Sequence, residues 1–257
     1  MSILKTTAKV LRQEEIAQDI FDMTISFPEG AKIARPGQFV GIYCKGGERL
    51  LPRPVSICGI DPSEGTVRIV YRIAGEGTRE FSGWKAGESF RILGPLGNGY
   101  SPGTGRAVIV GGGIGIPPML ELTRQIEGEK TVVLGYRTGA ETFLKEEFEE
   151  LAEVKIATDD GSEGVKGTVI DALRQGKVEG DILYACGPMP MLKALAEYAR
   201  EHGMEAQISL EERMACGIGA CLGCIVKTDK RDHHTNVHNK RICKDGPVFD
   251  AKEVFFS

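Results

Sequence analysis

The first hundred residues carry hydrophobic and polar positions in the period of two that is typical of β-strands. Thr24–Phe27 alternates, and the runs Phe39–Tyr43 and Val67–Tyr71 are rich in β-branched and aromatic residues. Breaks that contain proline or glycine, such as Pro36-Gly37, separate these runs. Many short strands at this spacing predict a small barrel or sandwich over residues 1–102.

Beyond a linker at Ser101–Gly105 the pattern changes to strands that alternate with helices. Ala107–Val110 is an apolar strand, and a glycine cluster and a helical run from about Pro117 to Ile126 follow it. Further strands are expected at Thr131–Tyr136, Val154–Thr158 and Asp181–Ala185, and further helices near Thr142–Leu151, Thr168–Gln175 and Pro188–His202. This alternation predicts a doubly wound parallel sheet over residues 103–213.

The last segment, residues 214–257, keeps neither pattern and holds four of the seven cysteines. Cys216, Cys221, Cys224 and Cys243 have the spacing C-x4-C-x2-C…C, which is typical of plant-type [2Fe–2S] clusters. The interleaved glycines let backbone amides face the cluster sulfurs. A structural zinc site is the alternative, but zinc modules usually present paired C-x-x-C sequences, and the first gap here is four residues. The segment is therefore predicted to be a small iron–sulfur module.

Two glycine turns in the second region each follow a strand and open a helix. The first lies in Gly111–Pro118 and the second is Cys186-Gly187-Pro188. Glycine lets the backbone approach a pyrophosphate, and a helix N-terminus offers free amides and a positive dipole end. The first turn departs from G-x-G-x-x-G because Ile116 stands at the third glycine. A dinucleotide site is predicted here, and close packing at strand–helix junctions is the alternative reason for the glycines.

A third set of candidate residues lies in the β region. In Arg53-Pro-Val-Ser56 the arginine fork suits a phosphate and the serine suits a ring heteroatom. In Val70-Tyr71-Arg72 the tyrosine offers a stacking face, and the amides of Gly77-Thr78 could cap a phosphate. Each residue alone is more often an ordinary strand or surface residue, so the set gains weight only in combination.

Taken together, these motifs resemble the ferredoxin-NADP reductase superfamily. The matching runs are Arg53-Pro-Val-Ser56, Gly94-Pro-Leu-Gly-Asn-Gly99, Gly111–Pro118 and Cys186-Gly-Pro188. Met214–Cys224 and Cys243–Phe249 narrow the resemblance to the electron-transfer subunits of NAD-dependent (class B) dihydroorotate dehydrogenases. This resemblance covers essentially the whole chain.

The resemblance implies an antiparallel FAD-binding β-barrel (1–102), an NAD-binding α/β domain (103–213) and a [2Fe–2S] module (214–257). Ser56 would lie near the flavin and Cys186 near the nicotinamide. The implied FAD residues are Arg53, Pro54, Val55, Ser56, Val70, Tyr71, Arg72, Gly77 and Thr78. The implied NAD residues are Gly111, Gly112, Gly113, Gly115, Cys186, Gly187 and Pro188, and the implied cluster ligands are Cys216, Cys221, Cys224 and Cys243.

The resemblance also implies an electron relay in pyrimidine (UMP) biosynthesis. A partner subunit with FMN would oxidise dihydroorotate, and electrons would pass through the cluster and FAD of this chain to NAD⁺. Two chains of each kind would form a heterotetramer. No general base for dihydroorotate is evident here, which is consistent with that site being on the partner.

Two alternatives stay open. The first is a subunit of an NADH-dependent ferredoxin:NADP oxidoreductase or of a sulfide dehydrogenase, with the same cofactors. An aspartate tends to replace the first cysteine in that group, so Cys216 argues against it. The second is a non-enzymatic interaction module that contains zinc.

Composition limits the class further. The net charge of −4 and the pI near 5.7 argue against general nucleic-acid binding. No stretch approaches the ~18–20 uninterrupted apolar residues of a membrane span, and the N-terminal segment lacks the apolar core of a signal peptide. We therefore expect a cytoplasmic protein that binds neither nucleic acid nor membranes.

Two short segments add predictions of their own. Asp159 and Asp160 follow a predicted strand of the second region, where carboxylates would repel the 2′-phosphate of NADP. NAD(H) should therefore be preferred, unless the two residues only form a turn. The segment Thr228–Lys240 holds His233, His234 and His238, and a solvated insert is favoured over a second metal site.

Overall fold

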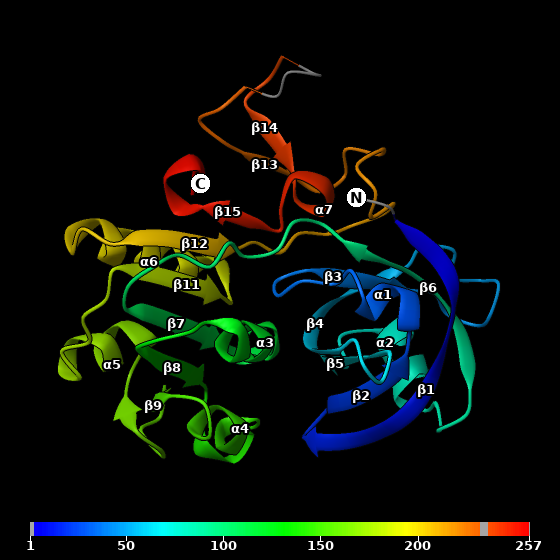
Figure 1. The fold of residues 1–257 in the computed structure, drawn as a ribbon, viewed down its shortest axis with the longest axis horizontal. Helices are drawn as coiled ribbons and strands as arrows, with labels where there is room; N and C mark the ends of the chain where they lie inside the picture. The colour runs from blue at the N-terminus through cyan, green and yellow to red at the C-terminus, as the bar shows by residue number, and fades with distance from the viewer. Residues whose placement is uncertain (1–2, 232–235, 257) are drawn as a thin grey trace.

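A closed antiparallel barrel forms the first region of the computed structural model, which describes residues 3–231 and 236–256 (Figure 1). The strand order is β1-β2-β5-β4-β3-β6. The strands are β1 (Leu4–Ala17), β2 (Ile20–Ser26), β3 (Phe39–Ile42), β4 (Arg53–Asp61), β5 (Thr66–Arg72) and β6 (Ser89–Leu96), with short helices α1 (Pro28–Ala31) and α2 (Glu76–Ser82). Alternate side chains such as Ile25, Ile57 and Ile69 fill the interior, so the predicted barrel is confirmed.

The second region is a sheet in the order β10-β9-β8-β7-β11-β12-β15, with parallel pairing from β10 to β12. Its parallel strands are β7 (Ala107–Gly112), β8 (Lys130–Tyr136), β9 (Glu153–Thr158), β10 (Val165–Lys166), β11 (Ile182–Cys186) and β12 (Glu205–Ser209). Its helices are α3 (Pro117–Gln125), α4 (Lys145–Glu149), α5 (Val169–Gln175) and α6 (Met189–Glu201), with short 3-10 turns η1 (Gly113–Gly115) and η2 (Gly139–Glu141). The predicted α/β architecture is confirmed.

Both faces of this sheet are covered, which explains why its strands are continuously apolar. In β7, Ala107 and Ile109 pack with the α3 and α4 side, whereas Val108 and Val110 pack with the α5 and α6 side. Helix α4 is shorter than the predicted Thr142–Leu151, because Leu144 before it adopts a positive φ of 62°. The other predicted helices and strands of this region agree with the structure to within about two residues.

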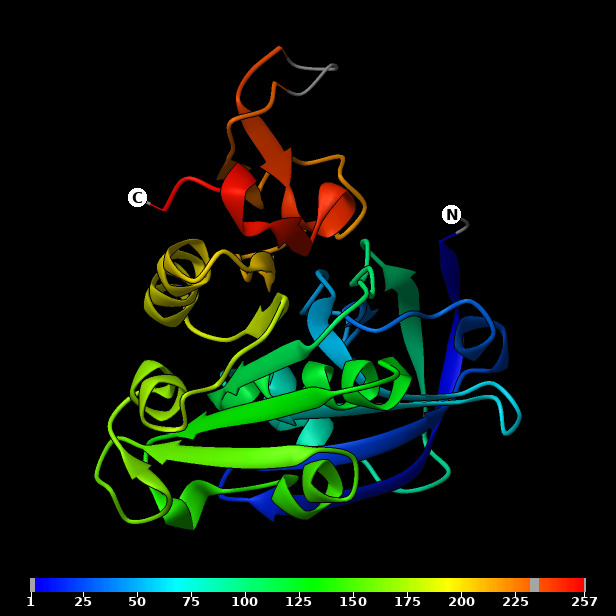
Figure 2. The same cartoon turned by 60° about the vertical axis from the view of Figure 1, so that its left-hand side comes forward.

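The third region holds Cys216, Cys221, Cys224 and Cys243 and packs against both other regions (Figures 1 and 2). It contains the hairpin β13 (Ile225–Lys227) and β14 (Asn239–Arg241), α7 (Ile242–Asp245), β15 (Val248–Asp250) and η3 (Ala251–Glu253). Strand β15 adds antiparallel to β12, a pairing that the sequence pattern did not predict. Near the end of β6, the Asn98 amide donates to the carbonyls of Lys244 and Asp245 at 3.1 Å each.

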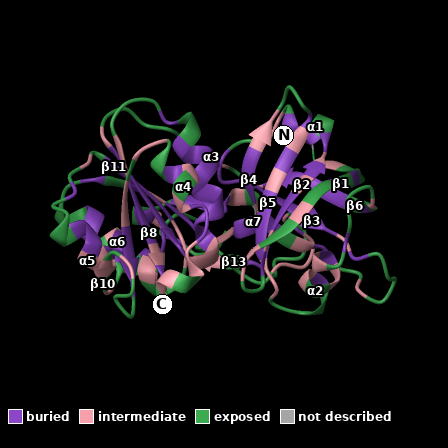
Figure 3. Ribbon diagram, turned by 90° about the horizontal axis from the view of Figure 1, so that it is seen from below, coloured by how far each residue is buried: buried purple, intermediate pink, exposed green. Residues whose placement is uncertain are grey.

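The barrel and the nucleotide region share a buried contact. Helix α3 packs on β4, and Cys58 of β4 and Val70 of β5 join the apolar cluster around α3. Figure 3 shows the buried residues concentrated in the strands and in α3, with exposed residues mainly in the surrounding loops. Among the described residues, no helix is long and apolar enough to cross a membrane.

Candidate functional site

Backbone amides converge on the sulfurs of all four cysteines of the third region. The amides of Ala220 and Cys221 donate to Cys216 Sγ at 3.3 and 3.4 Å, and that of Gly223 donates to Cys221 Sγ at 3.4 Å. Across the module, Gly219 N lies 3.1 Å from Cys243 Sγ, and Cys243 N lies 3.4 Å from Cys224 Sγ. Such amides stabilise negative charge on sulfur, which a thiolate-bound cluster requires.

The four cysteines are associated as two pairs. Cys221 is a side-chain hydrogen-bond partner of Cys216, and Cys224 is one of Cys243. Within residues 3–231 and 236–256, no three His, Cys, Asp or Glu side chains gather as a site for one metal ion. A single zinc needs its ligands around one point, whereas a two-iron cluster takes two thiolates at each iron. The four cysteines therefore provide the donor set that a [2Fe–2S] cluster requires.

Cys216 and Cys243 differ in the pKa of their thiols. Burial alone would raise the pKa of Cys216, but hydrogen bonds from the Ile218, Ala220 and Cys221 amides lower it to about 6. Burial raises the pKa of Cys243 to about 12, and the neighbouring Cys224 acts in the same direction. Near pH 7 Cys216 is therefore mostly ionised and Cys243 is protonated, so metal binding at Cys243 would release a proton.

The two glycine turns contact each other at the carboxyl ends of β7 and β11. A Cβ on Gly115 would lie 2.4 Å from the Cys186 carbonyl oxygen, so only glycine fits there. Cβ atoms on Gly112 and Gly187 would lie 2.5 Å from Met191 Sδ and 2.3 Å from Met191 Cε. A Cβ on Gly111 would likewise meet Ile116, at 2.9 Å. Backbone contacts thus account for Gly111 and Gly115, whereas at Gly112 and Gly187 the closest contact is with the flexible end of the Met191 side chain.

Gly113 is different from the other glycines of the first turn. Its φ is +53°, and a Cβ built on it would meet nothing within 4 Å. Gly113 is the first residue of η1, and Ile116 and then helix α3 follow η1. Gly113 is therefore the position at which this turn leaves room for a ligand beside the backbone.

Cys186 ends β11 beside a residue that the sequence analysis missed. Burial raises the pKa of Cys186 to about 12, and a hydrogen bond with Ser209 opposes the increase. Ser209 is its register partner on β12, and Tyr100 holds the strand end by donating to Ala185 O at 2.9 Å. Cys186 is therefore a neutral thiol near pH 7. Only strand pairing brings Ser209 here, so no local signal could have identified it.

The candidate FAD residues divide between the surface and the interior of the barrel. Arg53 lies against α2, where a Cβ on Gly77 would come within 2.1 Å of Arg53 Nε. Thr78 Oγ1 accepts from the Ala74 and Gly75 amides at 2.8 and 3.2 Å and so shapes the loop before α2. Arg53 therefore lies beside Gly77-Thr78 in the first turn of helix α2, although Arg53 and Gly77 are 24 residues apart in sequence, and together they form one corner of the barrel.

Tyr71 is placed differently from the expected stacking role. Its side chain is 3% exposed in the barrel core, stacked on Phe21 with ring centroids 5.9 Å apart. Its hydroxyl donates to Gln13 Oε1 at 2.9 Å. Val55 also faces the barrel core, whereas Val70 faces α3. The side chains of Arg53, Pro54, Ser56, Arg72 and Thr78 stay at least partly accessible.

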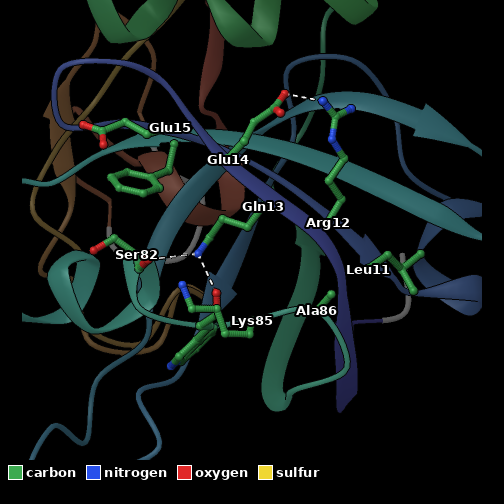
Figure 4. Close-up of a pocket in the computed structure, with 10 residues that line it drawn as sticks. Leu11, Arg12, Gln13, Glu14, Glu15, Ser82, Lys85 and Ala86 are labelled. Atoms are coloured by element: carbon green, nitrogen blue, oxygen red, sulfur yellow. Dashed lines mark hydrogen bonds and ion pairs between the residues drawn. The ribbon is translucent and has the colours of Figure 1, made fainter.

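A hollow of about 370 Å³ lies between β1 and the segment after α2 (Figure 4). Its lining includes Gln13, whose amide donates to the carbonyls of Phe81, Ser82 and Trp84 at 3.0–3.2 Å. None of the predicted site residues lines this hollow. The hydrogen bonds of Gln13 connect the end of α2 to strand β1 of the barrel.

The segment Thr228–Lys240, predicted to be a solvated insert, contains three histidines. His233 and His234 lie outside the described residues. His238 is exposed, and its Nδ1 lies 2.9 Å from the Asp229 carbonyl oxygen. The solvated insert stays a prediction.

Comparison with protein families gives two matches. Residues 211–255 match the iron–sulfur cluster binding domain of dihydroorotate dehydrogenase B, and residues 109–197 match the oxidoreductase NAD-binding domain. The first match contains all four cysteines, and the second contains both glycine turns.

Solved structures agree with this fold. The chain superposes with a TM-score of 0.87 on a structure described as an NADH-dependent reduced ferredoxin-NADP oxidoreductase, at 33% identity, covering 96% of this chain and 89% of that one. A ferredoxin NADP⁺ reductase from Neisseria gonorrhoeae shares the fold at a TM-score of 0.65 and 16% identity, covering 81% and 94%.

Curated relatives are similar over almost their full length. The electron transfer subunit of dihydroorotate dehydrogenase B (NAD(+)) from Caldanaerobacter subterraneus is 45% identical, covering 98% of this chain and 99% of the relative. The subunit of the same name from Geobacillus kaustophilus is 43% identical, covering 95% and 96%. The chain therefore belongs to the family of electron transfer subunits of dihydroorotate dehydrogenase B (NAD(+)).

Proposed function

We propose that this chain transfers electrons from the FMN of a dihydroorotate dehydrogenase catalytic subunit, through [2Fe–2S] and FAD, to NAD⁺ in pyrimidine biosynthesis. The observation that carries this proposal is the set of backbone amides that donate to the sulfurs of all four cysteines, within a segment that matches the iron–sulfur domain of this family. A flavin exchanges single electrons and also a hydride, so it suits the junction between a cluster and a nicotinamide.

Each region would contribute a defined set of residues. Cys216, Cys221, Cys224 and Cys243 would ligate the cluster, and the amides on their sulfurs would stabilise its charge. Arg53 and the Gly77-Thr78 turn would bind the FAD diphosphate, and Ser56 would lie near the flavin ring. Gly113 and the Cys186–Pro188 turn would receive NAD, with the neutral Cys186 thiol beside the nicotinamide. The division at residues 102 and 213 remains part of this proposal.

The catalytic partner would contact the third region, because electron transfer requires the cluster to lie close to it. Ile218, Leu222 and Ile225 expose 43–48% of their surface around Cys221, and such apolar exposure is typical of interaction sites. Basic steering is supported less well, since Glu253 pairs with both Lys230 and Lys240 and offsets part of their positive charge. We propose two chains of each kind in the complex, in the cytoplasm.

The cofactor content tests the proposal directly. Protein purified without oxygen should contain about one FAD and two irons per chain, as the barrel corner and the cysteine set require. Metal analysis and the visible spectrum measure both. A colourless protein with stoichiometric zinc would contradict the proposal and favour a zinc module.

Reconstitution tests the partner. Alone, the chain should reduce dyes with NADH and leave dihydroorotate unchanged. Mixed with an FMN-containing dihydroorotate dehydrogenase subunit, it should couple dihydroorotate oxidation to NAD⁺ reduction. No NAD⁺ reduction in a verified complex would overturn the assignment. The similarity to the ferredoxin-NADP oxidoreductase structure would then favour that second function, tested with reduced ferredoxin and NADP⁺.

A further inference from the structure

A network of ion pairs crosses the contact between the barrel and the nucleotide region, beside α4. Its centre is Arg68 of β5. The Arg68 Nε and Nη2 groups donate to the Asp22 carboxylate on β2 at 2.8–3.0 Å. Nη1 and Nη2 donate to the Glu147 carboxylate on α4 at 2.6 and 2.8 Å. One guanidinium thus makes two-point contacts with a carboxylate of each region, a geometry that lysine cannot reproduce.

Helix α3 continues the network onto β4. Arg124 Nη2 donates to Glu147 at 2.9 Å, and the Glu121 carboxylate accepts from the Ile60 amide at 3.0 Å. The Glu121 side chain is only 7% exposed.

The burial of these charges indicates a role in orientation more than in stability. The Asp22 side chain is 8% exposed and that of Arg68 is 21% exposed. Ion pairs at this depth lose hydration, so apolar residues often stabilise such a contact equally well. However, Arg68 can make two-point contacts with both Asp22 and Glu147 at only one placement of the nucleotide region on the barrel. The Arg68 hydrogen bonds also lower the pKa of the Glu147 carboxyl, which keeps it charged.

The elements that the network joins both lead to the proposed site. Helix α3 carries Glu121 and Arg124 and begins directly after the turn of Gly113. Strand β4, which Glu121 binds, begins at Arg53 and includes Ser56. Any rotation of α3 on β4 would therefore change the distance between the dinucleotide turn and the flavin corner.

We propose that Arg68 is a positioning residue, which holds the nucleotide region on the barrel at the orientation that hydride transfer between nicotinamide and flavin requires. This inference rests on the proposed function. In the measurable direction, NADH loses one hydride, that is one proton with two electrons, to oxidised FAD and leaves as NAD⁺. A misplacement of about 1 Å can slow such a step by about a hundredfold.

The test compares variants of the complete protein loaded with its cofactors. In anaerobic stopped-flow experiments, Arg68→Met should reduce the rate of flavin reduction at saturating NADH by about tenfold or more. FAD and iron content, and the apparent Kd of NADH, should stay within about twofold, because no contacting residue is removed. Arg68→Lys should give an intermediate rate, since it keeps the charge and loses the two-point contacts.

Arg106→Met is the matched control. It removes a pair with Glu179 at 2.9 Å that lies entirely within the nucleotide region. Its flavin reduction rate should equal that of the unmodified chain. If Arg68→Met does not accumulate as folded protein, Glu147→Gln provides the same comparison, with a several-fold decrease expected.

Cleavage of the exposed linker Ser101–Gly105 by subtilisin provides a readout that needs no cofactor. A loosened contact should speed this cleavage several-fold in Arg68→Met relative to the unmodified chain. An unchanged rate of flavin reduction in Arg68→Met overturns the positioning role, whatever the cleavage shows. If the unmodified chain binds no flavin, the proposed function is contradicted. In that case the cleavage assay still tests Arg68, because an unchanged rate of linker cleavage in Arg68→Met would overturn its role in orientation.

Discussion

The cysteine loop and the glycine turns are both rich in glycine, yet they use it for different purposes. In the cysteine loop, the Gly219 and Gly223 amides donate to cysteine sulfurs. In the turns, Gly112 and Gly115 make room for Met191 and for the Cys186 carbonyl, and only Gly113 faces open space. Cysteine spacing therefore indicates a site directly, whereas a glycine cluster first indicates a tightly packed strand–helix junction.

The physical reason is that the cysteine loop must supply hydrogen-bond donors, whereas the glycine turns must allow strands and helices to pack closely. A cluster needs donors directed at its ligands, and a short loop can supply them locally. A parallel sheet covered on both faces brings α3, α6 and the ends of β7 and β11 within van der Waals contact. Glycine at that junction is required by packing even when no dinucleotide is bound.

Removing one cysteine should have the largest effect. Cys221→Ser should lose the cluster and most of the iron, because a hydroxyl replaces a thiolate ligand, while FAD in the separate barrel is largely kept. Iron analysis and EPR of the reduced protein measure this. Cys44→Ala, in the barrel core, should keep the cluster signal. A reduced-cluster EPR signal that is unchanged in Cys221→Ser would show that Cys221 is no ligand.

Adding a methyl group at Gly115, which packs against the backbone of the second glycine turn, should lower folding stability. The added methyl of Gly115→Ala would lie 2.4 Å from the Cys186 carbonyl oxygen, so the free energy of unfolding should fall by about 3 kcal/mol. Urea unfolding measures this difference. Gly47→Ala, where a Cβ meets nothing within 4 Å, should change stability by less than about 0.5 kcal/mol. Equal stability of the two variants would refute the packing explanation.

The dinucleotide preference should follow the acidic residues after β9. The Asp160 carboxylate accepts from the Ser162 amide at 3.0 Å and from its hydroxyl at 2.6 Å, so Asp160 serves the turn. Asp159 is exposed and is the candidate for rejecting the 2′-phosphate. We expect kcat/KM for NADH to exceed that for NADPH by about tenfold or more, a difference of ~1.4 kcal/mol. Asp159→Ser should narrow the ratio, and comparable values in the unmodified chain would contradict the prediction.

The smallest effect on binding is expected at Gly113, where a Cβ would meet open space. Gly113→Ala forces a side chain into a φ of +53°, which should cost about 1 kcal/mol and weaken NADH binding several-fold. Gly128→Ala is the matched control, since Gly128 also has a positive φ, +85°, and open space around it but lies outside the turns. Titration with NADH separates the two variants. If Gly113→Ala and Gly128→Ala bind NADH with equal affinity, Gly113 is not part of the dinucleotide site.

Local sequence patterns by themselves determined the chemistry and the elements of this protein. The period-two segments, the strand–helix alternation and the spacing of Cys216, Cys221 and Cys224 predicted a barrel, a doubly wound sheet and a cluster module. Each of these signals lies within a few residues, where backbone geometry relates sequence directly to structure.

Only the tertiary structure decided which face each residue occupies and which distant strands meet. Sequence pattern places Tyr71 on a strand, but barrel closure directs its ring into the core, against Phe21. Strand pairing sets Ser209 beside Cys186 and adds β15 to β12, and domain packing joins Arg68 to Glu147. These contacts link positions tens of residues apart, and their energies depend on burial and on two-sided geometry that no local pattern encodes.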